Sequence, residues 1–198
     1  MAIRIKGTRM VYFPVPKIAC TSIKAAIIKQ EEPDIYDKLE SLGKIHTGRY
    51  TTVEFSKVRL RWRLFSRPVC VVRDPISRFV SGYRNRILHH DDMGGIQPSI
   101  DEFALNLSAH IESFAAVRHH FSPMTLFLGE NSNFYEHIFD ISEVDRLFDY
   151  LGVASVGRKQ TGGPKIERDA LSETAISHLK KFYAEDFDVY GEYFKQGE

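Results

Sequence analysis

The segment at residues 10–28, MVYFPVPKIACTSIKAAII, constrains the fold of this chain more than any other segment. Its first four residues are apolar and predict a short buried strand, and the two prolines that follow predict a turn. A polar loop with Lys17, Thr21 and Ser22 leads directly into a helix that has isoleucines on one face. Because the first N–H groups of a helix are free and the helix dipole is positive there, such a loop attracts anions. The segment therefore predicts a binding site for phosphate or a similar anion.

A second strand-to-helix transition follows at residues 68–83. The run Val69–Val72 is apolar at every position, as expected for a central parallel strand that is buried on both faces. Asp74 and Pro75 form a favourable N-cap and first residue of a new helix. Arg73 then lies at the carboxyl end of a strand, and Ser81 lies about two turns into the helix. Ligands of open α/β sheets bind at this edge, which makes Arg73 and Ser81 candidate ligand-binding residues.

The rest of the chain alternates between helical and extended patterns. This alternation predicts a single domain over residues 1–198, of the α/β class, with a central, mainly parallel sheet flanked by helices. Further helices are expected at 31–42, 75–87, 99–114, 142–151 and 172–186, and further strands at 124–128 and 135–141.

Composition excludes several classes of protein. Apolar residues make up 43% of the chain and charged residues 27%, which is typical of soluble globular proteins. The net charge of +1 gives no support to a nucleic-acid or membrane partner. The two cysteines are fifty residues apart, which fits neither a disulfide framework nor a metal site, and no apolar run approaches the length of a membrane span. We therefore expect a soluble, cytoplasmic protein without a bound metal.

The two transitions together resemble the nucleotide-binding motifs of the sulfotransferases that use 3′-phosphoadenosine-5′-phosphosulfate. The first is similar to the family's PKxxxTS loop and the second, RDPISRFVSGY, to its RDPxxRxxSxY motif, and they occur in the same order. The likeness is greatest to the branch of the Golgi carbohydrate and heparan 2-O-sulfotransferases, whose last helix also resembles the segment FYAEDFDVYG near the C-terminus. The likeness covers the motifs and the framework between them. It implies a P-loop-like three-layer sandwich.

The resemblance also implies a reaction and a set of site residues. The donor is 3′-phosphoadenosine-5′-phosphosulfate, the product is 3′-phosphoadenosine 5′-phosphate, and the acceptor is a hydroxyl, with a carbohydrate as the leading class. Lys17 corresponds to the group at the bridging oxygen, Thr21 and Ser22 to the 5′-phosphate ligands, and Arg73 with Ser81 to the 3′-phosphate ligands. A basic, glycine-rich loop at residues 157–165 adds Lys159 and Lys165. These two lysines either approach the 3′-phosphate or are simply solvated. The expected donor-binding residues are Pro16, Lys17, Ala19, Cys20, Thr21, Ser22, Arg73, Ser81, Lys159 and Lys165.

An acceptor hydroxyl needs a base, and histidine is the usual base near neutral pH. His46 is the first candidate, because the heparan-type enzymes carry a catalytic histidine in the corresponding loop. The alternative histidines are His89, His90, His119 and His120. We predict that Arg78 is a structural residue that pairs on the surface of its helix, and that Cys70 belongs to the core.

Two other functions fit parts of the pattern. A P-loop phosphotransferase would carry both glycines of GxxxxGK(S/T), which residues 14–24 lack, and its lysine would adjoin the hydroxyl residue. Its second strand would end in an aspartate for magnesium, where this chain has Arg73. The other alternative is a nucleotide- or glycan-binding module that has this fold without catalysis. The sequence identifies neither the acceptor nor the oligomeric state.

Overall fold

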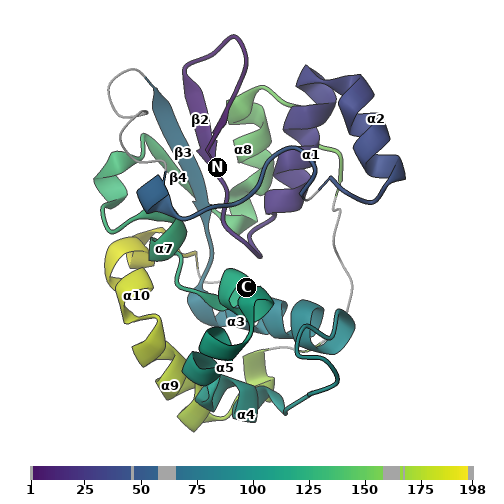
Figure 1. Cartoon of the computed structure of the whole chain (residues 1–198). Coiled ribbons are helices and arrows are strands. Elements are labelled where there is room, and N and C mark those ends of the chain that lie inside the picture. Colours follow the sequence, from purple (N-terminus) through teal and green to yellow (C-terminus); the bar gives the residue numbers. More distant parts are fainter. Residues whose placement is uncertain (1, 46, 58–65, 158–165, 167, 196–198) are drawn as a thin grey trace.

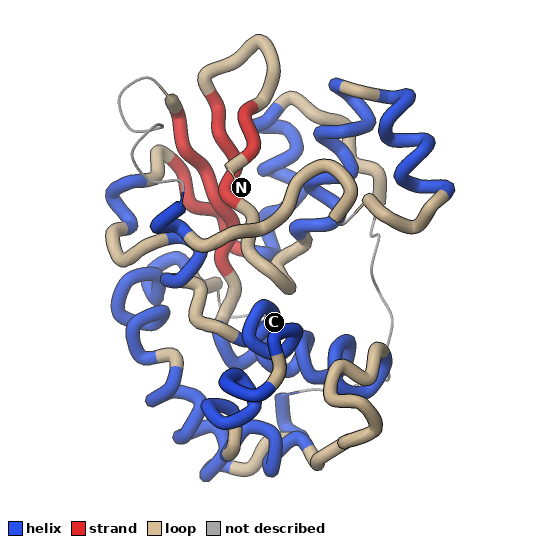
Figure 2. Tube along the Cα trace, in the orientation of Figure 1, coloured by secondary structure: helices blue, strands red, loops and turns tan. Residues whose placement is uncertain are grey.

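The computed structural model describes residues 2–45, 47–57, 66–157, 166 and 168–195. Its centre is a four-stranded sheet with the strand order β1-β2-β3-β4; the strands are red in Figure 2. The strands β2, β3 and β4 are parallel to one another, and the two-residue strand β1 is antiparallel to β2. The strands span Ile3–Arg4 (β1), Met10–Phe13 (β2), Arg67–Val72 (β3) and His137–Asp140 (β4). This confirms the predicted α/β class with a mainly parallel sheet.

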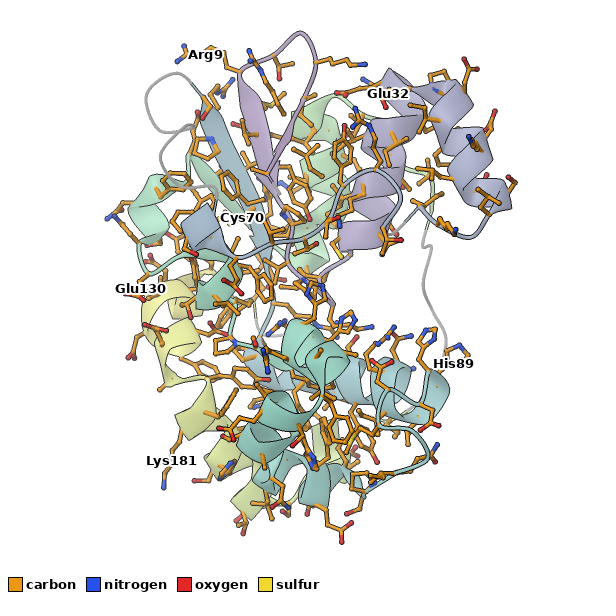
Figure 3. The ribbon with its side chains drawn as sticks, viewed as in Figure 1. Arg9, Glu32, Cys70, His89, Glu130 and Lys181 are labelled. Carbon is orange, nitrogen blue, oxygen red and sulfur yellow. The ribbon has the colours of Figure 1, made fainter. Side chains whose placement is uncertain are left out.

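The central strands are apolar because both of their faces are covered. Every residue of β2 is buried, and so is every residue of β3 after Arg67. Cys70 lies in this core, as predicted, and Figure 3 labels it within the sheet. In register, Tyr12 of β2 lies opposite Val69, and Val71 of β3 lies opposite Phe139.

Helices α1 (Cys20–Glu31) and α8 (Val144–Leu151) lie beside each other on one face of the sheet (Figure 1). The side-chain amide of Gln30 donates to the carbonyl of Gly152 over 2.9 Å and joins the ends of the two helices. Helix α2 (Pro33–Ser41) packs against α1. The opposite face is covered by the short helical segment η1 (Phe55–Lys57), where the rings of Phe55 and Phe134 pack against Phe13.

A group of helices lies at the carboxyl ends of the strands, below the sheet in Figure 1. It has its own apolar core, in which the ring of Phe121 lies 5.7 Å from Phe79 and 4.9 Å from Phe103. The group comprises α3 (Pro75–Gly82), the π-helix η2 (Tyr83–His89), α4 (Ile100–Leu105), α5 (Leu107–Ser113), α6 (Ala115–Phe121), α9 (Glu173–Phe182) and α10 (Ala184–Tyr190).

Within the described ranges, no helix is both long and apolar enough to span a lipid bilayer.

The predicted cap at Asp74 is confirmed, and two further helix ends show equally local signals. The carboxylate of Asp74 accepts a hydrogen bond from the N–H of Ser77 over 2.8 Å at the start of α3. Ser99 and Glu102 form a reciprocal capping box at the start of α4. Gly152 ends α8 with a left-handed φ of 66°. These signals were readable because each involves residues within one helical turn.

Two expected long helices are interrupted. The helix expected at 99–114 breaks at Asn106, whose side-chain amide donates to the carbonyl of Glu102 over 2.9 Å. This bond competes with the helical pattern. The helix expected at 172–186 breaks at Tyr183, whose hydroxyl donates to the carbonyl of Phe121 over 2.8 Å. In both places a side-chain bond to the backbone accompanies the break.

The strand expected at 124–128 is wrong, because Thr125–Leu128 forms the short helix α7. The buried carboxylate of Asp186 accepts hydrogen bonds from the N–H groups of Met124 (2.8 Å) and Thr125 (2.9 Å). These N–H groups have no partner inside a helical turn, so a carboxylate from elsewhere in the chain stabilises the helical start. The apolar run could not reveal this, because Asp186 is about sixty residues away.

Candidate functional site

The loop between β2 and α1 has an unusual backbone. Lys17 and Ala19 adopt left-handed conformations with φ of 66° and 49°, although neither is glycine. Such conformations cost roughly 1–3 kcal/mol each and are found mainly at functional sites. Ala19 is the N-cap of α1 and has no side chain that could cap the helix. The N-terminus of α1, with the positive end of its dipole, therefore lies in this loop without a side-chain cap from Ala19.

Two arginines donate hydrogen bonds to the backbone carbonyls of this loop. The Nε of Arg78 donates to the carbonyl of Pro16 over 3.1 Å, and Nη1 of Arg73 donates to the carbonyl of Lys17 over 3.4 Å. Arg78 also donates to the carbonyls of Ser122 (2.9 Å) and His120 (3.3 Å). The prediction that Arg78 pairs on the helix surface is wrong, because its side chain is buried with an exposed fraction of 1%. Its guanidinium instead connects the loop to the C-terminal end of α6.

A cavity of about 450 Å³ opens in front of the loop. Ser81 reaches it from α3, and Arg73 reaches it from the end of β3. Most of the residues expected to bind the donor are thus brought together in one place. Pro16 is the exception among the described residues: it is buried, and its carbonyl supports the loop. The expected residues that line the cavity are Lys17, Ala19, Cys20, Thr21, Ser22, Arg73 and Ser81.

The far wall of the cavity was not anticipated from the sequence. Ile141, Val144 and Phe148 provide an apolar surface there, and Ser155 and Gly157 contribute polar edges. The spacing of Val144 and Phe148 predicts one face of a helix. Nothing in that spacing indicates whether the face meets the core or a ligand.

The cavity carries buried positive charge. The pKa of Lys17 is lowered to about 8, mainly by burial; Cys20 opposes this shift, and the charges of Arg86, Arg73 and Arg78 contribute to it. Burial likewise lowers the pKa of Arg73. Within the described part of the chain, neither side chain forms an ion pair with a carboxylate. Lys17 and Arg73 therefore give one side of the cavity a positive charge that an anionic ligand would neutralise, whereas Asp145 of α8 adds a carboxylate on the far wall.

Three of the expected residues, His46, Lys159 and Lys165, lie outside the described residues. The other candidate bases do not line the cavity. His89 and His90 are exposed at the end of η2, and Figure 3 labels His89 at its outer tip. His119 and His120 belong to α6, where the ring of His119 lies 5.9 Å from that of Phe127.

His90 is the described candidate base whose pKa depends in part on the charge of Lys17. Partial burial lowers the pKa of His90, and the positive charges of Arg86 and Lys17 contribute. Across the described ranges, no group of three histidine, cysteine or acidic residues could hold a metal ion.

Comparison with known proteins gives one positive result. A model of the Sulfotransferase family matches residues 2–194, which is nearly the whole chain. Neither the curated proteins nor the solved structures contain a significant match. The matched region includes the strained loop, the cavity and the helices that surround it. The chain therefore belongs to the Sulfotransferase family, a family of enzymes that transfer sulfuryl groups.

Proposed function

We propose that this protein transfers the sulfuryl group of 3′-phosphoadenosine-5′-phosphosulfate to an acceptor hydroxyl, with a carbohydrate as the leading acceptor class. One observation carries the proposal. The loop residues Lys17, Thr21 and Ser22 converge on the same cavity as Arg73 and Ser81, which come from a second strand-to-helix transition. The proposal includes a P-loop-like three-layer sandwich, in which this loop connects a central strand to the helix that follows it.

The cavity suits the three parts of the donor. The 5′-phosphosulfate would lie at the N-terminus of α1, where Thr21 and Ser22 offer hydroxyls and backbone N–H groups. The guanidinium of Arg73 would hold the 3′-phosphate, because its planar donors match a phosphate in two-point contact. The apolar wall formed by Val144 and Phe148 would receive the adenine ring.

The chemistry follows from this placement. The acceptor oxygen attacks sulfur, the bond from sulfur to the bridging oxygen breaks, and the acceptor proton passes to a base. Negative charge then accumulates on the leaving 5′-phosphate oxygen, where the ammonium of Lys17 stabilises it. In this scheme the side chains of the protein supply the positive charge, and no metal is invoked.

The donor class is tested by measuring the affinity for 3′-phosphoadenosine 5′-phosphate, ADP and magnesium-ATP by calorimetry. The wild type is expected to prefer the 3′-phosphorylated nucleotide without metal. Arg73→Ala should weaken that nucleotide about 10- to 100-fold, the value of one charge-assisted contact, and leave ADP nearly unchanged. Arg118→Ala is the matched control, because Arg118 is exposed on α6 and does not line the cavity.

Three outcomes would contradict this assignment. Equal losses for both nucleotides in Arg73→Ala would refute the 3′-phosphate role. A preference for magnesium-ATP would favour a phosphotransferase. Absence of binding by any of the three ligands would favour a module without donor chemistry.

The resemblance to the heparan-type enzymes assigns the role of the base to His46. His46→Ala should lower turnover by about 100-fold or more, the usual contribution of a general base, with little change in nucleotide affinity. His90→Ala is the informative comparison, because the charge of Lys17 contributes to lowering the pKa of His90. Turnover assays that find His46→Ala active and His90→Ala inactive would move the role to His90.

A further inference from the structure

Lys17 is held by a residue that belongs to neither nucleotide-binding motif. Its Nζ donates a hydrogen bond of 2.7 Å to Oδ1 of Asn85, which is 68 positions away in the sequence. Asn85 lies on η2, and its side chain is buried with an exposed fraction of 7%. The contact is thus short and largely shielded from water. It gives the long lysine side chain a fixed end point.

The backbone around Asn85 is specialised. Tyr83–His89 is wound as a π-helix, in which the N–H of His90 donates to the carbonyl of Asn85 over 3.1 Å. Turns of this kind are rare and frequently occur at functional sites. Ser81 lies four residues before Asn85, so the two residues share one face of the continuous helical segment. Ser81 lines the cavity, and Asn85 reaches the lysine beside it.

The chemistry of the partner matters as much as its position. Several guanidinium groups surround Lys17, and Arg86 on η2 is already paired with Asp92 over 2.6 Å. An amide oxygen stabilises an ammonium group without cancelling its charge. A carboxylate in the same place would neutralise the charge and compete with an anionic donor. Asn85 therefore orients Lys17 and leaves its charge available.

We propose that Asn85 is the positioning residue of Lys17, whose ammonium it fixes beside the N-terminus of α1, ready for the leaving oxygen. This inference rests on the proposed function for its catalytic consequence. The contact itself is independent of any reaction.

The proposal predicts the direction in which the pKa of Lys17 changes when Asn85 is replaced. The pKa of Lys17 is lowered to about 8, so its charge is lost as the pH rises through that value. Loss of the accepting oxygen destabilises the ammonium and lowers this pKa, whereas a carboxylate raises it. Turnover needs the charged form, so the alkaline limb of kcat/KM, which reports groups of the free enzyme, follows the same pKa. The titratable or charged groups that face Lys17 are Cys20 on α1, Arg73 after β3, Arg78 on α3, Arg86 on η2 and His90 at the end of η2.

The experiment compares Asn85→Ala and Asn85→Asp with the wild type. Lysine side chains labelled with ¹³C at Cε are titrated by NMR in the nucleotide-free protein, and the signal missing from Lys17→Ala identifies Lys17. The pKa is expected to fall by about one unit in Asn85→Ala, since a bond to a charged group is worth that much, and to rise in Asn85→Asp. Asn133→Ala, at an exposed site on another segment, should leave it unchanged.

Turnover over the same pH range provides the second measurement. We expect kcat of Asn85→Ala to fall about 10-fold or more, as for a misplaced catalytic group, with the KM for the donor nearly unchanged. The alkaline limb of kcat/KM should move to lower pH in Asn85→Ala and to higher pH in Asn85→Asp. A purely structural role for Asn85 would not move the two limbs in opposite directions.

The outcomes separate the two proposals. If the wild type transfers no sulfuryl group, the proposed function fails, yet the titration still decides whether Asn85 holds Lys17. An unchanged pKa of Lys17 in both variants overturns the positioning role, and so does wild-type kcat in both. If Asn85→Ala loses cooperative unfolding, Asn85→Asp, which has nearly the same shape, carries the test alone.

Discussion

Replacing Lys17 by alanine is expected to lower turnover by about 1,000-fold or more, because a preorganised donor to the leaving oxygen is removed. Affinity for 3′-phosphoadenosine 5′-phosphate should fall much less. In the proposed complex the other cavity residues, including Arg73 and Ser81, would still contact the nucleotide. The measurement pairs single-turnover kinetics with calorimetry on the same preparation, so that chemistry and binding are separated.

Lys29→Ala is the control for this experiment. Lys29 belongs to the same helix region as the loop, but it is exposed at the last turn of α1, with its ammonium 5.4 Å from the ring of Tyr36. Its loss should leave turnover unchanged. If Lys17→Ala retains most of the activity, Lys17 does not stabilise the leaving oxygen. If binding and turnover fall equally, its role is to hold the nucleotide in the ground state.

Replacing Arg78 by methionine is expected to lower the free energy of unfolding by about 3–5 kcal/mol, because a buried charged donor to several backbone carbonyls is removed. The variant leaves three buried carbonyls, those of Pro16, His120 and Ser122, without the donor that they have in the wild type. Unsatisfied buried acceptors of this kind are costly. The loss is measured by denaturant unfolding at constant pH.

Arg118→Met provides a matched comparison for Arg78→Met. Arg118 also donates to two carbonyls, those of Ile111 and Glu112, but its side chain is exposed. Water can replace these bonds, so the expected loss is below about 1 kcal/mol. Equal losses in the two variants would show that the buried network of Arg78 is not important for stability.

The effect of Arg78→Met should also depend on pH. Burial raises the pKa of Asp186, and the charge of Arg78 partly opposes that rise. Without Arg78 the folded-state pKa rises further, so the folded variant binds a proton that the unfolded chain releases. The stability of the variant then increases as the pH falls through that pKa, and the difference from the wild type becomes smaller. A difference that grows on acidification would contradict this coupling.

The local features of this protein could be predicted from its sequence. The strand–loop–helix around Lys17, the strand that ends at Arg73 and the cap at Asp74 each depend on residues within a few positions of one another. Propensity and capping act over that range. Two buried parallel strands place their carboxyl ends at one edge of the sheet, so the convergence of Lys17 with Arg73 and Ser81 was also predictable.

Other features could not be predicted because they depend on contacts between distant segments. Asp186 stabilises the start of α7, which the apolar pattern alone assigns to a strand. The sequence predicts that Arg78 lies on the surface of its helix, but in the fold the loop and the end of α6 bury it. In both cases a buried polar group needed a partner, and the partner came from far along the chain.

The sequence by itself determined the class of fold, the anion-binding loop and the identity of most residues that line the cavity. Only the tertiary structure decided that α8 forms the far wall and that Asn85 receives the ammonium of Lys17. The physical reason is the range of the forces. Backbone preferences and helix caps are set by neighbours in the chain, whereas burial and the satisfaction of polar groups are set by whichever segments meet in space.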